Sequence, residues 1–314
     1  MMISIGVDVG GTSIKGAAVN EKGEILSRFK MPTELDPKGI HTVNSLIALI
    51  KTFIYDNHFE KDVVGIGLGI PGCIDVDKGI VCSSANLKWE NLPISDMFKN
   101  AFPYPIRITN DANAAALGEA KFGGGKNYNS SIMITLGTGI GGGVVIDGKL
   151  FEGNEGKGTE LGHMVIDVNG RTCGCGRKGC LEAYASATGL IRSTKSAMDA
   201  HPSSLMHKIA RELGGIDGRV AFRACQAGDP AGIEVIDKYI YYLSEGLLNF
   251  CNIFRPNVII LSGGIANVGQ YLIDRVNTYL EEHDYGYKNA PAVPVVLGQL
   301  GYDSGIIGAA SLWL

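Results

Sequence analysis

The sequence NDANAAALGE, residues 110–119, decides the interpretation of the whole chain. The preceding residues, PIRIT (105–109), end in alternating β-branched side chains, which predicts a short strand that stops at Asn110. Asn110 is a favoured N-cap residue, Asp111 lies where the helix dipole favours an anion, and the alanine-rich run has high helix propensity. The pattern therefore predicts a carboxylate between a strand and a helix, where open α/β sheets bind ligands. On helix-start statistics alone, Asp111 is more simply interpreted as a second capping residue.

The composition limits the class of protein. With 314 residues, 45% of them hydrophobic and 19% charged, we expect a soluble globular protein of two ordinary domains. No stretch reaches the length of a membrane span, and the start, MMISIGVDVGG, lacks a signal region, so we expect a cytoplasmic protein. The net charge of -4, without a long basic block, argues against a nucleic-acid-binding surface. The 44 glycines cluster in short loops, which indicates backbone that approaches a ligand closely.

A glycine-rich turn near the start lies between two predicted strands, at residues 3–9 and 13–19. The turn offers a carboxylate, bare backbone amides and a hydroxyl, and this combination suits a phosphate chain with its Mg²⁺. An ordinary glycine hairpin turn explains the same pattern. The groups belong to Asp8, Gly10, Gly11 and Thr12.

Strands and helices alternate along the rest of the chain, as in an α/β protein. The expected strands are residues 25–29, 63–70, 257–266 and a last one in VPVVLGQL (293–300); the expected helices are 38–57, 181–200, 231–254 and 303–314. We expect the final helix to pack back onto the first domain. The segment SSANLKW (83–89) is typical of a loop, in which Asn86 either makes an Asx turn or offers its amide to sugar hydroxyls.

A second glycine turn repeats the first. ITLGTGIGGGVVIDG, residues 134–148, again predicts strand, glycine and threonine turn, and strand, with Thr135 in the place of Asp8. Two copies of one unit, separated by about half the chain, predict a duplicated fold with a cleft between the copies. Two such turns facing each other would hold an oligophosphate from both sides. The second turn contributes Gly137, Thr138 and Gly139.

The segment ELGHMVIDVNGRTCGCGRKGCLE, residues 160–182, carries one imidazole and three thiols. Such a set suits a closed tetrahedral Zn²⁺ site, and because four protein ligands leave no open position, we expect a structural metal. A chance grouping of free cysteines is the alternative. The four donors are His163, Cys173, Cys175 and Cys180. Glu160 and Glu182 flank the segment, either as solvated surface or as ligands of a polyol.

The motifs DVGGTSIK, GIPG, SSANLKW, TNDANAAALGE, TLGTGIGGG, ELGH, CGCGRKGCLE and LSGGI occur in this order, and with them the chain closely resembles the ROK family of bacterial sugar kinases, above all its glucokinases. The resemblance implies the duplicated α/β fold of the actin-like (ribonuclease H-like) ATPases, with two lobes around a cleft, and a homodimer. It places residues 1–120 and 301–314 in a smaller lobe. Residues 121–300 then form the larger lobe, with the zinc loop and a helical interface region.

The resemblance also implies roles for individual residues. Asp111 is the expected general base. The expected sugar-binding residues are Asn86, Asn110, Asp111, Glu160, His163 and Glu182. ATP and Mg²⁺ are expected at Asp8, Gly10, Gly11, Thr12, Lys15, Gly137, Thr138 and Gly139, with the adenosine at Gly263 and Gly264. The expected zinc ligands are His163, Cys173, Cys175 and Cys180, so that His163 binds zinc with one ring nitrogen and faces sugar with the other.

The implied function is ATP-dependent phosphorylation of the 6-hydroxyl of glucose, a reaction of glycolysis, with no nucleic-acid or membrane partner. A kinase for N-acetylmannosamine, N-acetylglucosamine, allose or fructose stays open, as does polyphosphate as the donor. A sugar-responsive repressor of the same family would carry a helix-turn-helix ahead of the first hairpin, and because the first strand begins at Ile3 we expect none. The zinc loop disfavours a chaperone-like ATPase without a sugar substrate.

Overall fold

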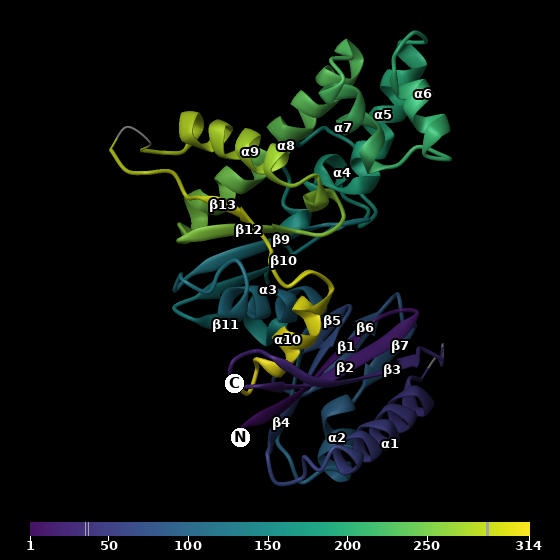
Figure 1. Cartoon of the computed structure of the whole chain (residues 1–314), viewed down its shortest axis with the longest axis vertical. Helices are drawn as coiled ribbons and strands as arrows, with labels where there is room; N and C mark the ends of the chain where they lie inside the picture. The colour runs from purple at the N-terminus through teal and green to yellow at the C-terminus, as the bar shows by residue number, and fades with distance from the viewer. Residues whose placement is uncertain (35, 37, 287–288) are drawn as a thin grey trace. The chain divides into compact units, whose positions relative to one another are not determined.

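A computed structural model describes residues 1–34, 36, 38–286 and 289–314. The chain forms two compact units (Figure 1). The first comprises Met1–Ile132, Gly143–Thr159 and Gln299–Leu314, and the second comprises Met133–Gly142 and Glu160–Gly298. The lobe boundaries inferred near residues 120 and 300 stay predictions.

The first unit is built on a five-stranded sheet of order β3-β2-β1-β4-β8. The two strands of the predicted glycine hairpin and the strand predicted after them are antiparallel neighbours, whereas β4 and β8 run parallel to β1. All five predicted strands are confirmed, with ends that differ by up to three residues. Their bounds are β1 Ile3–Val9, β2 Ser13–Asn20, β3 Ile25–Pro32, β4 Val63–Ile70 and β8 Ile106–Asn110.

Helices cover both faces of this sheet. Because successive strand residues point to opposite faces, the isoleucines and valines of β1 pack on α1 (Ile40–Asp56), while Gly6 faces α10 (Ser304–Ala310). Gly6 pairs in register with Gly67 of β4. A Cβ at Gly67 would lie 1.9 Å from the carbonyl oxygen of Ala309, so only glycine lets α10 approach this closely. The final helix therefore packs onto the first unit, as expected.

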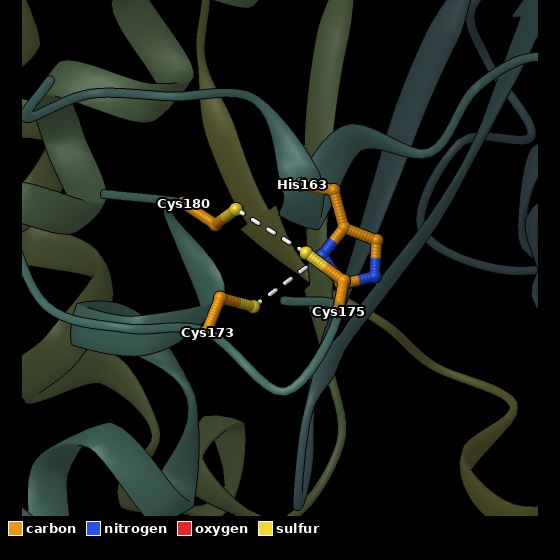
Figure 2. Close-up of side chains that lie close together, drawn as sticks. All are labelled: His163, Cys173, Cys175 and Cys180. Carbon is orange, nitrogen blue, oxygen red and sulfur yellow. Dashed lines mark hydrogen bonds between the residues drawn. The ribbon is translucent and has the colours of Figure 1, made fainter. Parts of the chain in front are cut away.

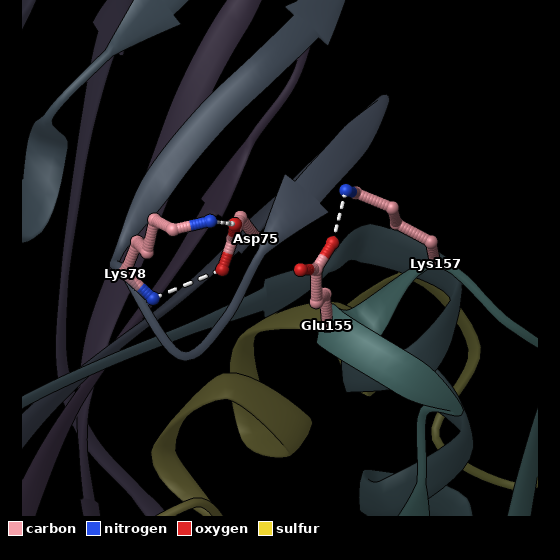
Figure 3. Close-up of polar contacts among 4 residues, drawn as sticks. All are labelled: Asp75, Lys78, Glu155 and Lys157. Carbon is pink, nitrogen blue, oxygen red and sulfur yellow. Dashed lines mark hydrogen bonds and ion pairs between the residues drawn. The ribbon is translucent and has the colours of Figure 1, made fainter.

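A small three-stranded sheet, β5-β6-β7, corrects one expectation. The segment 83–89 is not wholly a loop, because Ser84 and Trp89 pair across an antiparallel ladder. Beside β5, the turn after Asp75 and the short helix η1 each carry an internal ion pair, Lys78 to Asp75 and Lys157 to Glu155 (Figure 3). The bounds are β5 Cys73–Asp75, β6 Ile80–Ser84, β7 Trp89–Leu92, η1 Asn154–Gly156, and α2 Ile94–Ala101, which follows β7.

A second five-stranded sheet, of order β11-β10-β9-β12-β13, repeats the plan of the first. In both sheets three consecutive strands run in reverse order and are followed by two later strands. The duplication predicted from the two glycine turns is therefore confirmed. The bounds are β9 Ser131–Leu136, β10 Ile140–Ile146, β11 Lys149–Phe151, β12 Val258–Ser262 and β13 Val295–Leu297.

The second unit also contains a helical region. The single helix expected at residues 181–200 is wrong: Ser186 has an extended backbone, and its Oγ accepts a hydrogen bond from Gly189 N as the N-cap of a new helix. Among the described residues, no helix combines the length and apolarity that crossing a membrane requires. The helices are α4 Glu182–Ala185, α5 Ala187–Ala200, α6 Met206–Glu212, α7 Gly218–Gln226, α8 Pro230–Phe254 and α9 Gln270–His283.

Candidate active site

The helix α3 (Asp111–Phe122) begins where β8 ends, as the sequence predicts. Asn110 is its N-cap: the amide oxygen accepts hydrogen bonds from Ala112 N at 2.9 Å and Asn113 N at 3.4 Å. Its Nδ2 donates to the carbonyl oxygen of Gly72 at 3.1 Å, which leaves one N–H of this amide for a ligand. Asp111 is thus the first helical residue. The side chain of the preceding Asn110 fixes the backbone at this point by bonding both to Gly72 and to the first turn of α3.

Asp111 lies close to the sheet because β4 carries a glycine opposite it. A Cβ at Gly69 would lie 3.6 Å from Asp111 Cα and 3.0 Å from Ala114 Cβ. Burial raises the pKa of the Asp111 carboxyl, and the hydrogen bond from Ala112 N and the Asn110 side chain oppose that rise. The pKa of Asp111 is thereby closer to that of an effective general base than the pKa of an exposed aspartate is.

The first glycine turn joins β1 to β2 and brings a second acid to this side of the sheet. Asp8 pairs across the ladder with Lys15. Burial, and then the charge of Asp111, raise the pKa of Asp8 from 3.8 to about 6, and Lys15 lowers it. A carboxylate whose charge is disfavoured by burial and by a second carboxylate, next to a lysine, forms a site that a divalent cation or a cationic group would stabilise.

The turn itself is fixed by its neighbours. Gly10 N donates to Ser13 O at 3.1 Å, and Thr33 Oγ1 donates to Gly10 O at 2.6 Å. Gly11 lies against Asn86, whose Cβ would be 3.7 Å from a Cβ at that glycine. The structure thus brings Asn86, from the turn between β6 and β7, to the first glycine turn, and Thr12 is exposed there.

The second glycine turn, residues 137–139, belongs to the second unit. Gly137 N donates to Gly139 O at 3.1 Å, and Gly141 N donates to Thr135 Oγ1 at 3.1 Å. Thr135 stands in the place of Asp8, but its hydroxyl accepts this hydrogen bond next to the turn. The second turn therefore has no carboxylate at the position that Asp8 occupies in the first. Gly263, with φ of 89°, lies at the end of β12 against Leu136, whose backbone would be 2.8 Å from a Cβ there. Gly264 and Thr138 are exposed.

The four predicted metal ligands come together. Their donor atoms all lie within 4.8 Å of one another. His163 Nδ1 is 3.6 Å from Cys173 Sγ, and Cys175 Sγ is 3.7 Å from Cys180 Sγ (Figure 2). Zinc bonds of about 2.3 Å to sulfur and about 2.0 Å to nitrogen place tetrahedral donors roughly 3.5 to 3.8 Å apart. The cluster is therefore compatible with one tetrahedral zinc ion.

The loop that carries the cysteines needs glycine at its bends. Gly176 and Gly179 have φ of 88° and 77°, and a Cβ at Gly179 would lie 1.7 Å from Asp167 O. Burial raises the pKa of the Cys173 thiol to about 12. The pKa of Cys175 is lowered, first by the hydrogen bond from Arg177 N.

The two flanking glutamates differ in their surroundings. Glu160 is exposed at the start of a single 3₁₀ turn that ends at His163. Its carboxylate has no hydrogen-bond partner among the described residues, so it is available to a ligand. Glu182 instead accepts from Ile140 N at 2.9 Å with Oε2 and lies 3.4 Å from Cys173 Sγ with Oε1.

The predicted residues thus fall into two groups, one in each unit. One neighbour was missed: Gly305 of α10, where a Cβ would lie 3.2 Å from Asp8 Cγ. The glycine-rich end of the sequence was a signal for close packing, but it did not reveal the partner.

The sequence matches the ROK family over residues 4–314, and the chain belongs to that family. It is 35% identical to a glucokinase of Halalkalibacterium halodurans, over 99% of this chain and 94% of that protein. It is also similar to the crystal structure of a ROK family glucokinase from Streptomyces griseus in complex with glucose and AMPPNP, with 33% identity, a TM-score of 0.77 and 99% of each chain covered. A xylose repressor of Bacillus subtilis is 29% identical, over 98% of this chain and 76% of the repressor.

Proposed function

We propose that this protein is an ATP-dependent glucose kinase that transfers the γ-phosphoryl group of ATP to the 6-hydroxyl of glucose. The observation that carries the proposal is the likeness to glucokinases along nearly the whole of both chains. A half-buried carboxylate at a helix start supports it, because sugar phosphorylation needs a positioned acceptor for the hydroxyl proton.

Asp111 is the proposed general base. Phosphoryl transfer passes through a loose transition state, so catalysis is mainly positioning and charge stabilisation, with little demand for a strong base. The proton of the 6-hydroxyl moves to Asp111 as the hydroxyl oxygen bonds to phosphorus, and ADP leaves. The cap of Asn110 on α3 holds the carboxylate in place during this step.

The sugar is proposed to contact Asn86, Asn110, Asp111, Glu160, His163 and Glu182. Within the described part of the chain, the Glu160 carboxylate has no hydrogen-bond partner and Asn110 keeps one amide N–H unpaired. Carboxylates and amides of this kind bind neighbouring hydroxyls with directional hydrogen bonds, so their loss would mainly raise the KM for sugar.

ATP is proposed to lie with its phosphates at the two glycine turns. Asp8 would hold the Mg²⁺, and Lys15 would bind a phosphate oxygen. The bare amides of the turns would donate hydrogen bonds to the other phosphate oxygens. Gly263 and Gly264 would face the adenosine. When bound, Mg²⁺ supplies charge stabilisation for the transferring phosphoryl group, and it would make ionisation of Asp8 favourable.

A structural zinc ion is proposed at His163, Cys173, Cys175 and Cys180. Because His163 Nδ1 is the nitrogen nearest Cys173, the metal would take Nδ1 and leave Nε2 for the sugar. The ion would order the loop that carries these ligands. A metal that takes no part in the chemistry would therefore still affect activity.

We further propose a cytoplasmic homodimer that acts in glycolysis, as the family resemblance implies. The helix α8 leaves Ile233, Tyr241 and Ile253 exposed and is the proposed part of the subunit interface. We also propose that the family's two lobes divide near residues 120 and 300.

A coupled ADP-release assay of the purified protein tests the proposal, with a panel of hexoses and N-acetylhexosamines, with and without Mg²⁺. We expect glucose to give the highest kcat/KM and the rate to require Mg²⁺. A higher value for another hexose or for an N-acetylhexosamine would favour the alternative substrates, and polyphosphate in place of ATP tests the donor.

The repressor alternative is weaker. The repressor of Bacillus subtilis is 29% identical to this chain, whereas the glucokinase of Halalkalibacterium halodurans is 35% identical. A gel-shift experiment that showed specific binding to an operator would overturn the kinase proposal.

A further inference from the structure

The second glycine turn is held by one short segment, residues 182–188, of which the proposed mechanism uses Glu182 alone, as a sugar contact. The segment begins at Glu182 and ends at Thr188, in the first turn of α5. It contacts the turn and the first residue of β10 through three hydrogen bonds: Ile140 N to Glu182 Oε2 at 2.9 Å, Ala187 N to Gly137 O at 2.8 Å, and Thr188 Oγ1 to Thr138 O at 2.7 Å.

The same segment is tied to the cysteine cluster. It starts two residues after Cys180, and Glu182 Oε1 lies 3.4 Å from Cys173 Sγ. Between them, Leu181 is fully buried, donates its N–H to Met164 O at 2.9 Å and packs on Gly246 of α8, where a Cβ would lie 2.6 Å from the leucine side chain. A displacement of the cysteine loop would therefore displace the 182–188 segment as well, because the tightly packed Leu181 joins the two.

From these contacts we infer that Glu182 and Thr188 are positioning residues for the phosphate-binding turn, and that metal binding at the cysteine cluster sets the affinity for nucleotide. The inference rests on the proposed function, since it requires that the turn binds phosphates. Backbone amides bind a phosphate well only when they are already oriented, because ordering the loop on binding costs free energy. The 182–188 segment supplies that order before the nucleotide arrives.

Orienting the turn is a different role for Glu182 from the contact with sugar that the sequence suggests. A residue that only contacts sugar would change the affinity for sugar and leave that for nucleotide unchanged. A residue that orients the turn would weaken nucleotide binding even with no sugar present. Thr188 separates the two roles best, because it is exposed and its hydroxyl bonds, among the described residues, to the turn alone.

The first experiment measures ADP binding by calorimetry for the metal-loaded full chain without sugar. Replacement of Thr188 by valine removes one neutral hydrogen bond, so we expect the Kd for ADP to rise about 2- to 10-fold, and Thr188→Ser to restore it. Thr194→Val is the matched control, because Thr194 lies on the same helix and bonds to Leu190 O within it. Equal loss of affinity in Thr188→Val and Thr194→Val, or no loss in Thr188→Val, would overturn the inference.

The second experiment removes the metal with a chelator and measures hydrogen exchange of the Ile140 and Gly141 amides. We expect faster exchange at Ile140 and weaker ADP binding, and the same faster exchange in Glu182→Ala with metal present. Unchanged exchange and ADP affinity after verified metal loss would overturn the coupling. If the wild-type chain bound no ADP, the proposed function would fail first, whereas normal ADP binding with unaffected variants would refute the inference alone.

Discussion

Replacing Asp8 by asparagine should stabilise the ligand-free protein at neutral pH. Burial and the charge of Asp111 raise the pKa of Asp8 from 3.8 to about 6. A carboxyl with a higher pKa in the folded than in the unfolded chain binds its proton more tightly when folded, so the free energy of unfolding falls as the pH rises through this interval. This pKa change corresponds to a cost of up to about 3 kcal/mol above pH 7, which Asp8→Asn would avoid.

Urea unfolding of the wild-type chain and Asp8→Asn from about pH 4 to pH 8, without Mg²⁺ or nucleotide, checks this reasoning. We expect the variant to gain on the wild type as the pH rises and the gain to level off above the pKa of Asp8. Since Asp8 is proposed to hold Mg²⁺, Mg²⁺ with ATP should stabilise the wild type far more than the variant. A constant difference between the two proteins at all pH values, or a wild type that is the more stable at pH 8, would refute it.

Three further predictions concern the proposed base, the close helix packing and the metal. Asp111→Asn should lower kcat at least about 100-fold while the Kd for glucose changes less, because a positioned base acts mainly in the transition state; near-normal turnover in steady-state assays would exclude the assignment. Gly67→Ala should lower the free energy of unfolding by about 1–3 kcal/mol, since its Cβ would overlap Ala309 O, whereas Gly215→Ala, at a site with open space, should change it by less than about 0.5 kcal/mol in the same urea titration. Dialysis against a strong chelator should lower the melting temperature and the activity, and zinc should restore both; a melting temperature that does not move would contradict a structural metal.

The features that could be predicted from the sequence are those set by residues close together in the chain. The start of α3 follows from Asn110 and Asp111 alone, because an N-cap bonds to amides two and three residues away. The cysteine cluster follows likewise, since its four ligands lie between residues 163 and 180 and glycines permit the bends. The duplicated sheets were recognisable because the glycine turn occurs twice.

Features that depend on distant partners could not be predicted. Glu119 ends the NDANAAALGE stretch, yet its buried carboxylate accepts hydrogen bonds from Gly124 N, Gln299 N and Leu300 N, and the last two lie about 180 residues away in the chain. The partner of Glu182 was hidden for the same reason, because Ile140 begins β10, 42 residues earlier in the chain. The small sheet of β5, β6 and β7 was missed because strands of three to five residues carry too little periodicity to be recognised.

Transfer of the γ-phosphoryl group from ATP to the 6-hydroxyl of glucose is the step that defines the proposed activity. The most direct measurement is a phosphorus and proton NMR analysis of the products after incubation of the protein with ATP, Mg²⁺ and glucose. We expect equal amounts of ADP and glucose 6-phosphate. Release of ADP with inorganic phosphate alone, or a phosphate on another hydroxyl of glucose, would contradict it.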